Sequence, residues 1–145
     1  MNQILKIDPE TTISVRSVVL RPNRPIETCY FEGDNLPATT HFGYYTESEL
    51  VGIVSVFQKN NSTWDSKSQL QIRGMAVLPS FQQKGIGESL LKQAISFALE
   101  NEIQLIWFNA RKNAVPFYEK NGFHTIGAAF EIESVGTHYL MYRQL

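Results

Sequence analysis

At 145 residues, with 43% hydrophobic and 19% charged residues, the chain can bury a full core, so we expect one soluble globular domain over residues 1–145. Its formal net charge is −1 and it has no basic run, which argues against nucleic acid or an anionic membrane as the main partner. Neither a signal peptide nor an apolar run of membrane-spanning length is recognisable, so we expect a cytoplasmic protein.

The first 40 residues predict a strand and a helix. Residues 4–7 form a short strand candidate, and the apolar residues between positions 10 and 20 lie on one helical face. The proline-rich residues 21–25 should end this helix. Cys29 is the single cysteine, which excludes an internal disulfide and a cysteine-based zinc site.

The next segment predicts an antiparallel hairpin and a further strand. Residues 41–45 and 50–57 are rich in aromatic and aliphatic side chains and flank a polar turn. After a polar loop, residues 70–77 form another strand candidate. Gly74 inside this strand is typical of a β-bulge, although a glycine there also relieves tight packing.

A glycine-containing turn leads from this strand into the most regular helix of the sequence. Apolar residues recur at helical spacing from residue 84 to residue 100. The preceding pattern Gln82-x-x-Gly85-x-Gly87 lets backbone N–H groups approach a ligand, and the positive end of a helix attracts phosphate. Lys84 adds a positive charge. The turn therefore predicts a diphosphate cradle; the alternative is an ordinary strand–helix connection, and no nucleotide P-loop or dinucleotide fingerprint is present.

The C-terminal part predicts a strand, a short helix and a hairpin. Residues 103–108 are nearly all apolar, as in a parallel strand covered on both faces. We expect Asn113 to cap the next helix, Pro116 to lie in its first turn and Gly122 to end it. Residues 123–132 and 138–142 then form a hairpin around residues 133–137.

Two motifs resemble those of the GNAT N-acetyltransferase superfamily. They are the Gln82–Gly87 turn and the segment Asn113-Ala114-Val115-Pro116-Phe117-Tyr118-Glu119-Lys120-Asn121-Gly122-Phe123, in the family's order and separation. The resemblance covers residues 70–123. It implies an α/β (α+β) fold with a mixed, mostly antiparallel sheet of about six to seven strands, a central splayed parallel pair and about four flanking helices.

The resemblance also implies direct transfer of the acetyl group of acetyl-CoA to a small-molecule or peptide amine, without a metal. It leaves open whether the protein forms a homodimer. A non-catalytic coenzyme-A-binding module on the same fold is the alternative, and a nucleic-acid-binding domain is disfavoured by the lack of a basic stripe. Direct transfer needs no acyl-enzyme, so Cys29 is not expected to act as a nucleophile.

By the same resemblance, the coenzyme would be held by a strand edge, the turn and one further residue: Met75, Ala76, Val77, Gln82, Gln83, Lys84, Gly85, Ile86, Gly87 and Asn113. Asn113 would contact the pantetheine arm, and a backbone N–H from residues 75–77 would stabilise the oxyanion. Tyr118 would face the thioester sulfur and donate a proton to the departing thiolate; its alternative role is that of a core tyrosine. Gln83 departs from the family pattern, which has a small residue there.

The acceptor side is less defined by the sequence. Residues 68–79 contain no Asp or Glu, so the strand carboxylate that serves some relatives as a base is absent. In its place, the expected base is a water chain that ends at His41, Glu133 or His138, and the sequence spacing does not favour any one of the three. For Arg73, Trp107 and Asn109, acceptor lining and strand packing are both open. We expect core packing for four aromatic residues, with the lining of an acceptor pocket as the alternative: Phe31, Phe42, Tyr44 and Tyr45. We expect Glu133 to lie beside His138 and to make it an anchor for a cationic amine, with a base as the alternative.

Overall fold

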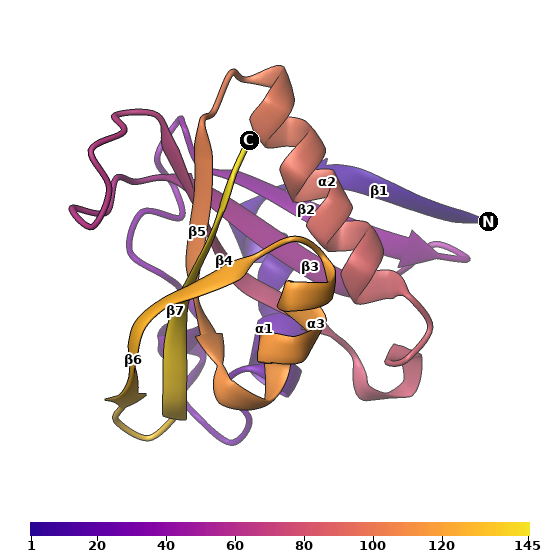
Figure 1. Ribbon diagram of the computed structural model, residues 1–145. Coiled ribbons are helices and arrows are strands. Elements are labelled where there is room, and N and C mark those ends of the chain that lie inside the picture. The colour runs from indigo at the N-terminus through magenta and orange to yellow at the C-terminus, as the bar shows by residue number, and fades with distance from the viewer.

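The computed structural model describes all residues from 1 to 145, and its centre is a seven-stranded sheet in the order β1-β2-β3-β4-β5-β7-β6 (Figure 1). Only β4 and β5 are parallel neighbours. The strands are β1 (Asn2–Ile7), β2 (Thr40–Thr46), β3 (Glu49–Gln58), β4 (Gln69–Val77), β5 (Leu105–Arg111), β6 (His124–Ile132) and β7 (Gly136–Gln144).

Three α-helices accompany the sheet: α1 (Ile13–Val19), α2 (Ile86–Glu100) and α3 (Val115–Lys120). The predicted α/β fold class is therefore confirmed. The expected fourth helix is replaced by short 3₁₀ turns, at Pro9–Thr12, Ile26–Cys29, Pro79–Phe81 and Lys112–Ala114. No helix combines the length and the apolar content that crossing a membrane would require.

The helices cover the two faces of the sheet unequally. α2 and α3 lie in front of the sheet in Figure 1, and α1 lies behind it. α2 buries Leu90 and Leu91 completely in a cluster of 17 core residues, and burial of each such side chain stabilises the fold by about 1.5–3 kcal/mol. The α1 face has a smaller core, formed by Val15, Ile53 and Ala76. The second face therefore has room for polar groups.

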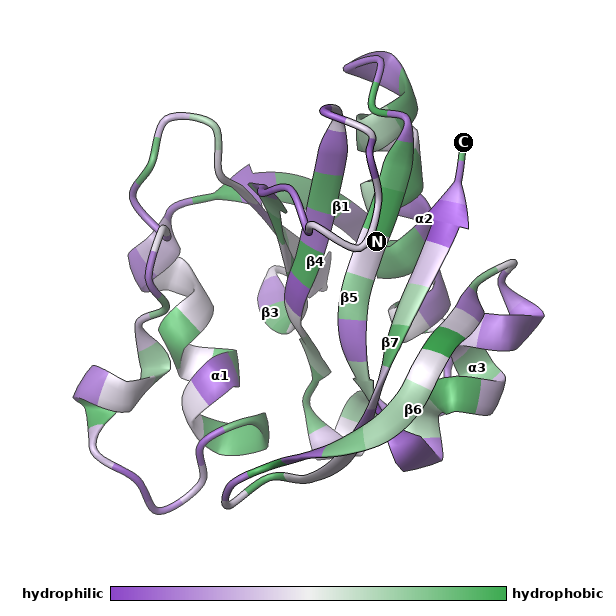
Figure 2. Ribbon diagram, turned by 60° about the vertical axis from the view of Figure 1, so that its left-hand side comes forward, coloured by the Kyte–Doolittle hydropathy of each residue, from purple (hydrophilic) through white to green (hydrophobic).

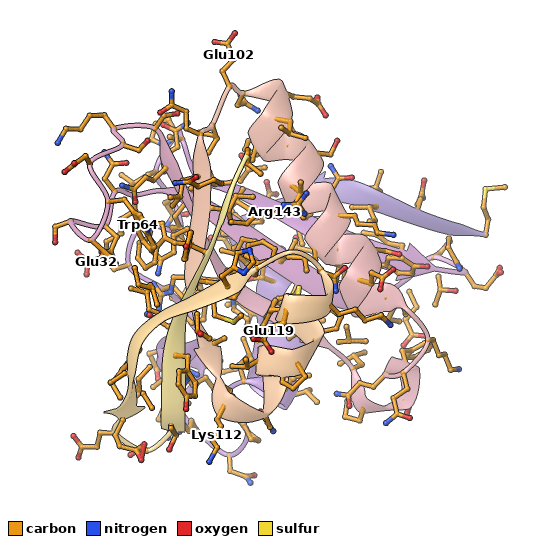
Figure 3. The ribbon with its side chains drawn as sticks, viewed as in Figure 1. Glu32, Trp64, Glu102, Lys112, Glu119 and Arg143 are labelled. Carbon is orange, nitrogen blue, oxygen red and sulfur yellow. The ribbon has the colours of Figure 1, made fainter.

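The sequence predicted the C-terminal end of α3 correctly but not its N-terminal cap. Gly122 has φ +89° and follows the helix, and the Phe123 N–H donates to the Tyr118 carbonyl at 3.1 Å, which is the expected glycine stop. The expected cap by Asn113 is wrong, because residue 113 belongs to the preceding 3₁₀ turn and Ala114 occupies the cap position. Arg143 on β7 donates to the Asn121 carbonyl at 3.1 Å and ties the sheet to the end of α3 (Figure 3).

A β-bulge in β4 coincides with the separation of β4 from β5. Ile53 and Ser55 of β3 pair with Ala76 and Arg73, so β4 carries one extra residue there. Gly74 lies in this extra stretch with φ +65°, a conformation that favours glycine, so the predicted bulge is confirmed. β4 pairs with β5 only at residues 69–71, and beyond them the two strands diverge. The divergence leaves polar backbone groups of both strands without sheet partners.

Candidate active site

A cleft of about 400 Å³ opens where β4 and β5 diverge. Its walls come from residues 71–75 of β4, residues 108–111 of β5, the end of α1, Tyr118 of α3 and the β6–β7 hairpin. Figure 2 shows α1 to the left of β4 and β5, and the turn end of the β6–β7 hairpin reaches below α1 on that same side. Segments that are distant in sequence therefore meet at the cleft.

Tyr118 forms part of the cleft wall and is held by aromatic neighbours. Its ring centroid lies 4.4 Å from that of Phe108, 5.2 Å from Phe117 and 6.2 Å from Phe123. Its hydroxyl has no hydrogen-bond partner within the protein. Burial raises the pKa of Tyr118 to about 12, so the phenol is protonated at neutral pH.

The turn before α2 presents free backbone donors. Gln83 has φ +62° and Gly85 has φ +81°, and the N–H groups of Gln83, Lys84 and Gly85 make no hydrogen bond within the protein. The first turn of α2 follows directly and adds N–H groups that lack intrahelical partners. A Cβ on Gly85 would meet open space. Chemically, this arrangement suits a diphosphate.

The edge of β4 that faces β5 offers a further donor at Val77. The Leu78 N–H donates to the Val51 carbonyl of β3 at 2.8 Å, and antiparallel pairing alternates along a strand. The N–H of Ala76 therefore faces β3, and the N–H of Val77 faces the gap. The carbonyl of Val77 accepts from the Gln82 side chain at 2.9 Å, which anchors the turn to the strand. Met75 lines the cleft itself.

His138 lies in the cleft wall and is nearly fully buried. Its Nδ1 lies 2.8 Å from the Gly136 carbonyl, which can only accept a hydrogen bond. In the neutral ring the proton is therefore on Nδ1, and Nε2 carries the free lone pair. Glu133 is exposed, does not line the cleft and forms no ion pair with His138. The expected Glu133–His138 pair is thus wrong, because the hairpin turn directs the histidine to a backbone carbonyl.

His41 lies away from the cleft, in a buried polar network between α1 and the sheet. Its Nδ1 lies 2.6 Å from the Ser55 hydroxyl, and its Nε2 lies 3.0 Å from the Asp34 carbonyl. Arg16 donates to the Asp34 carboxylate at 2.7 and 3.1 Å and to Ser55 at 3.1 Å. The structure therefore makes His41 a structural residue rather than an acceptor contact.

Of the three residues left open between lining and packing, Arg73 and Asn109 line the cleft. Trp107 is buried and donates its indole N–H to the Lys59 carbonyl at 2.9 Å, which is a packing role. Asn113 is exposed in its 3₁₀ turn and outside the cleft wall.

Arg21 and Arg111 are among the lining residues that sequence reasoning missed, and Phe31 lines the cleft as well. Phe31 was expected to pack in the core, as Phe42 does. Arg111 follows Asn109 by two positions on β5 and therefore shares its face, a signal that was available in the sequence. Arg21 and Phe31 belong to irregular segments, whose path no periodicity predicts.

A sheet with a splayed parallel pair, a donor-rich turn at its edge and a tyrosine in the gap defines a protein of the acyltransferase class that the sequence resembles. Residues 28–141 match the family model described as "Acetyltransferase (GNAT) domain", and the chain belongs to this family. Acetyl transfer is the general activity that this membership supports.

One sequence relative and two solved structures are consistent with this family assignment. The chain is 30% identical to the "Uncharacterized N-acetyltransferase YitI" of Bacillus subtilis (strain 168), over all of this chain and 97% of the relative. The fold is similar to that of Escherichia coli ElaA, with a TM-score of 0.78 and 15% identity over 99% of both chains. It is also similar to an aminoglycoside 6'-N-acetyltransferase complexed with coenzyme A, with a TM-score of 0.76 and 14% identity over 98% of this chain and 96% of that one.

Proposed function

We propose that residues 1–145 form one N-acetyltransferase domain that transfers the acetyl group of acetyl-CoA directly to an amine. The observation that carries this proposal is the cleft between β4 and β5, with the donor-rich turn at its edge and Tyr118 in its wall. Family membership supports it, and so does the similarity in fold to an acetyltransferase that was solved in complex with coenzyme A.

The residues present fit acetyl-CoA. The unpaired N–H groups of Gln83, Lys84 and Gly85, with those of Ile86 and Gly87 in the first turn of α2, would hold the diphosphate, and the helix dipole adds to this attraction. The pantetheine arm would lie along the open edge of β4 beside Met75, and the exposed Asn113 would contact it from the turn that follows β5. When bound, acetyl-CoA supplies a thioester whose carbonyl an amine can attack and whose thiolate can leave.

The Val77 N–H is the donor we assign to the carbonyl oxygen of the thioester, because it faces the gap while that of Ala76 faces β3. A backbone donor fixed by the sheet needs no reorganisation when negative charge develops on that oxygen. Loss of one such donor in other acyl-transfer enzymes costs on the order of 10²–10³ in kcat.

Tyr118 stabilises the departing sulfur. A thiol has an ordinary pKa near ~8.5, so a phenol with a pKa of about 12 is the weaker acid and does not give up its proton alone. It donates a hydrogen bond to the thiolate and transfers its proton as it receives the one that the acceptor nitrogen loses. The phenol is thus regenerated, and the proton balance closes.

His138 supplies the base that the sequence lacks on β4. In neutral solution an amine is mostly protonated, so it must lose a proton before it can attack. The Gly136 carbonyl holds His138 in the tautomer whose Nε2 accepts, and this nitrogen can remove that proton. This role replaces the anchor for a cationic amine that we expected from the sequence.

The test combines binding and turnover. Calorimetry should show saturable binding of acetyl-CoA, and a thiol-release assay should show consumption that depends on an added amine. Binding without amine-dependent release from any acceptor would favour the non-catalytic coenzyme-A-binding module instead. Absence of binding would refute both functions.

A further inference from the structure

The charged side chains that line the cleft are all basic. Arg21, Arg73 and Arg111 contribute to its wall, and no aspartate or glutamate does. The whole chain carries a formal net charge of −1, so the positive charge is a property of this site. Glu32 and Glu133 belong to neighbouring segments, but both are exposed and outside the wall.

These arginines lack counter-ions within the protein. The salt bridge of the nearby Arg16 uses Asp34, whereas Arg21, Arg73 and Arg111 form none. Arg21 donates only to the adjacent Leu20 carbonyl, at 3.0 Å. The side chains of Arg73 and Arg111 donate no hydrogen bond to the protein, so their donors are available to a ligand.

Phe31 holds part of the arginine group in place. The guanidinium of Arg73 lies 4.5 Å from the centroid of the Phe31 ring, and those of Arg16 and Arg21 lie 3.9 and 5.6 Å from it. Arg73 also lies 5.6 Å from the Phe57 ring. Aromatic faces fix the orientation of a guanidinium without consuming its donors.

The environment of Arg21 and Arg73 is unfavourable for unpaired cations. Burial, and after it the neighbouring Arg16, lowers the pKa of Arg73; burial, and after it Arg24, lowers the pKa of Arg21. Arginine nevertheless stays protonated in proteins, so the charges remain and a bound anion would offset them.

We propose that the acceptor is a small amine that also carries an anionic group, a carboxylate or a phosphate, and that Arg21, Arg73 and Arg111 bind this group. This proposal rests on the proposed function. The guanidinium fork matches both anions bidentately. The acceptor nitrogen would then lie toward Tyr118 and His138 in the same cleft, whereas polyamines and basic peptides would be repelled.

Matched acceptor pairs test the proposal in the thiol-release assay. Phenylalanine is compared with phenylalaninamide, β-alanine with its amide, and O-phosphoethanolamine with ethanolamine, with spermidine as the cationic acceptor. We expect at least one anionic member to exceed its neutral counterpart by about 10- to 100-fold in kcat/KM. The first two pairs report on carboxylate and the third on phosphate. Binding of each compound to the coenzyme-A-bound protein is measured by calorimetry in parallel.

Two variants separate an anion contact from a structural role. Arg73→Gln and Arg111→Gln should raise the acceptor KM for the anionic compound by about 10-fold or more, with little change for its neutral counterpart or for acetyl-CoA. Arg111 is exposed, so Arg111→Gln keeps the test usable if Arg73→Gln fails to fold. Lys67→Gln is the matched control, because Lys67 is exposed in the β3–β4 loop, outside the cleft wall.

The proposal is overturned if neutral or cationic amines match their anionic counterparts in both turnover and binding, or if no anionic compound binds. If the wild-type protein neither binds nor turns over acetyl-CoA, the proposed function is refuted instead. In that case, calorimetry of the anionic compounds with the protein alone still decides whether the arginines bind them.

Discussion

Replacing Tyr118 with phenylalanine removes one hydroxyl and nothing else from the cleft. The ring keeps its contacts with Phe108, Phe117 and Phe123, at centroid distances of 4.4, 5.2 and 6.2 Å. Since the hydroxyl has no partner in the protein, its removal leaves no group unpaired. We therefore expect the free energy of unfolding at neutral pH to change by less than about 1 kcal/mol.

The rate should respond much more than the stability. A positioned proton donor contributes about 10²–10⁴-fold, which corresponds to roughly 2.7–5.5 kcal/mol of activation free energy. We expect kcat for acetyl transfer to fall within this range, while the affinity for acetyl-CoA stays nearly constant because the diphosphate cradle is untouched.

Alkaline pH gives a second readout of the same residue. The pKa of Tyr118 is about 12 in the folded protein, above the ordinary value near ~10 that applies to the unfolded chain. Below about pH 10 both states are protonated, and Tyr118 has no effect on the pH dependence of stability. Between about pH 10 and 12 only the unfolded state ionises, so wild-type stability falls there, and Tyr118→Phe should lack that decrease.

Thiol release under saturating acetyl-CoA, together with urea unfolding, measures both effects. Tyr142→Phe is the matched control, since that ring packs against Trp64 and His124 outside the cleft wall. A kcat for Tyr118→Phe within about twofold of wild type, with unchanged stability, would refute the reasoning and leave Tyr118 a structural residue.

Three further predictions concern the cradle, the base and the buried network. Gly85→Val and Gly127→Val both force valine into a positive φ (+81° and +79°) in open space, so both variants should lose about 1–3 kcal/mol of stability. Only Gly85→Val should weaken acetyl-CoA binding in calorimetry, and equal affinities of the two variants would refute the assignment of the turn as the diphosphate cradle. His138→Ala should lower kcat by about 10²–10⁴-fold with little change in acetyl-CoA affinity, and an unchanged kcat would return the role of the base to a water chain. Asp34→Asn leaves Arg16 without its carboxylate and should cost about 3–5 kcal/mol in urea unfolding at pH 7. Burial alone raises the pKa of Asp34, but the Arg16 hydrogen bonds hold it below its usual value, so the stabilisation is present above about pH 4 and is lost on further acidification; equal stability of wild type and variant at pH 7 would contradict it.

Local features of the chain were readable without the structure. The helical spacing of residues 84–100 places α2, and alternating or continuous apolar runs place β2 to β5, because side-chain periodicity follows directly from backbone geometry. Gly74, Gly85 and Gly122 mark the bulge, the turn and the helix end, since each has a positive φ that favours glycine. The spacing of the two motifs was enough to predict the family.

Tertiary structure decided which polar residues meet. Residues 21, 31, 73, 111 and 138 converge on one cleft because the bulge in β4 and the divergence from β5 bring irregular segments and strand ends together. The sequence could not distinguish His138 from His41, because the roles of both depend on distant partners: the Gly136 carbonyl in a hairpin turn, and Ser55 and Asp34 beneath α1. Net charge does not reveal a basic site either, because it sums the charges of the whole chain, whereas strand register decides which few side chains line the cleft. Local patterns thus determined the elements, and long-range strand pairing decided the chemistry of the acceptor side.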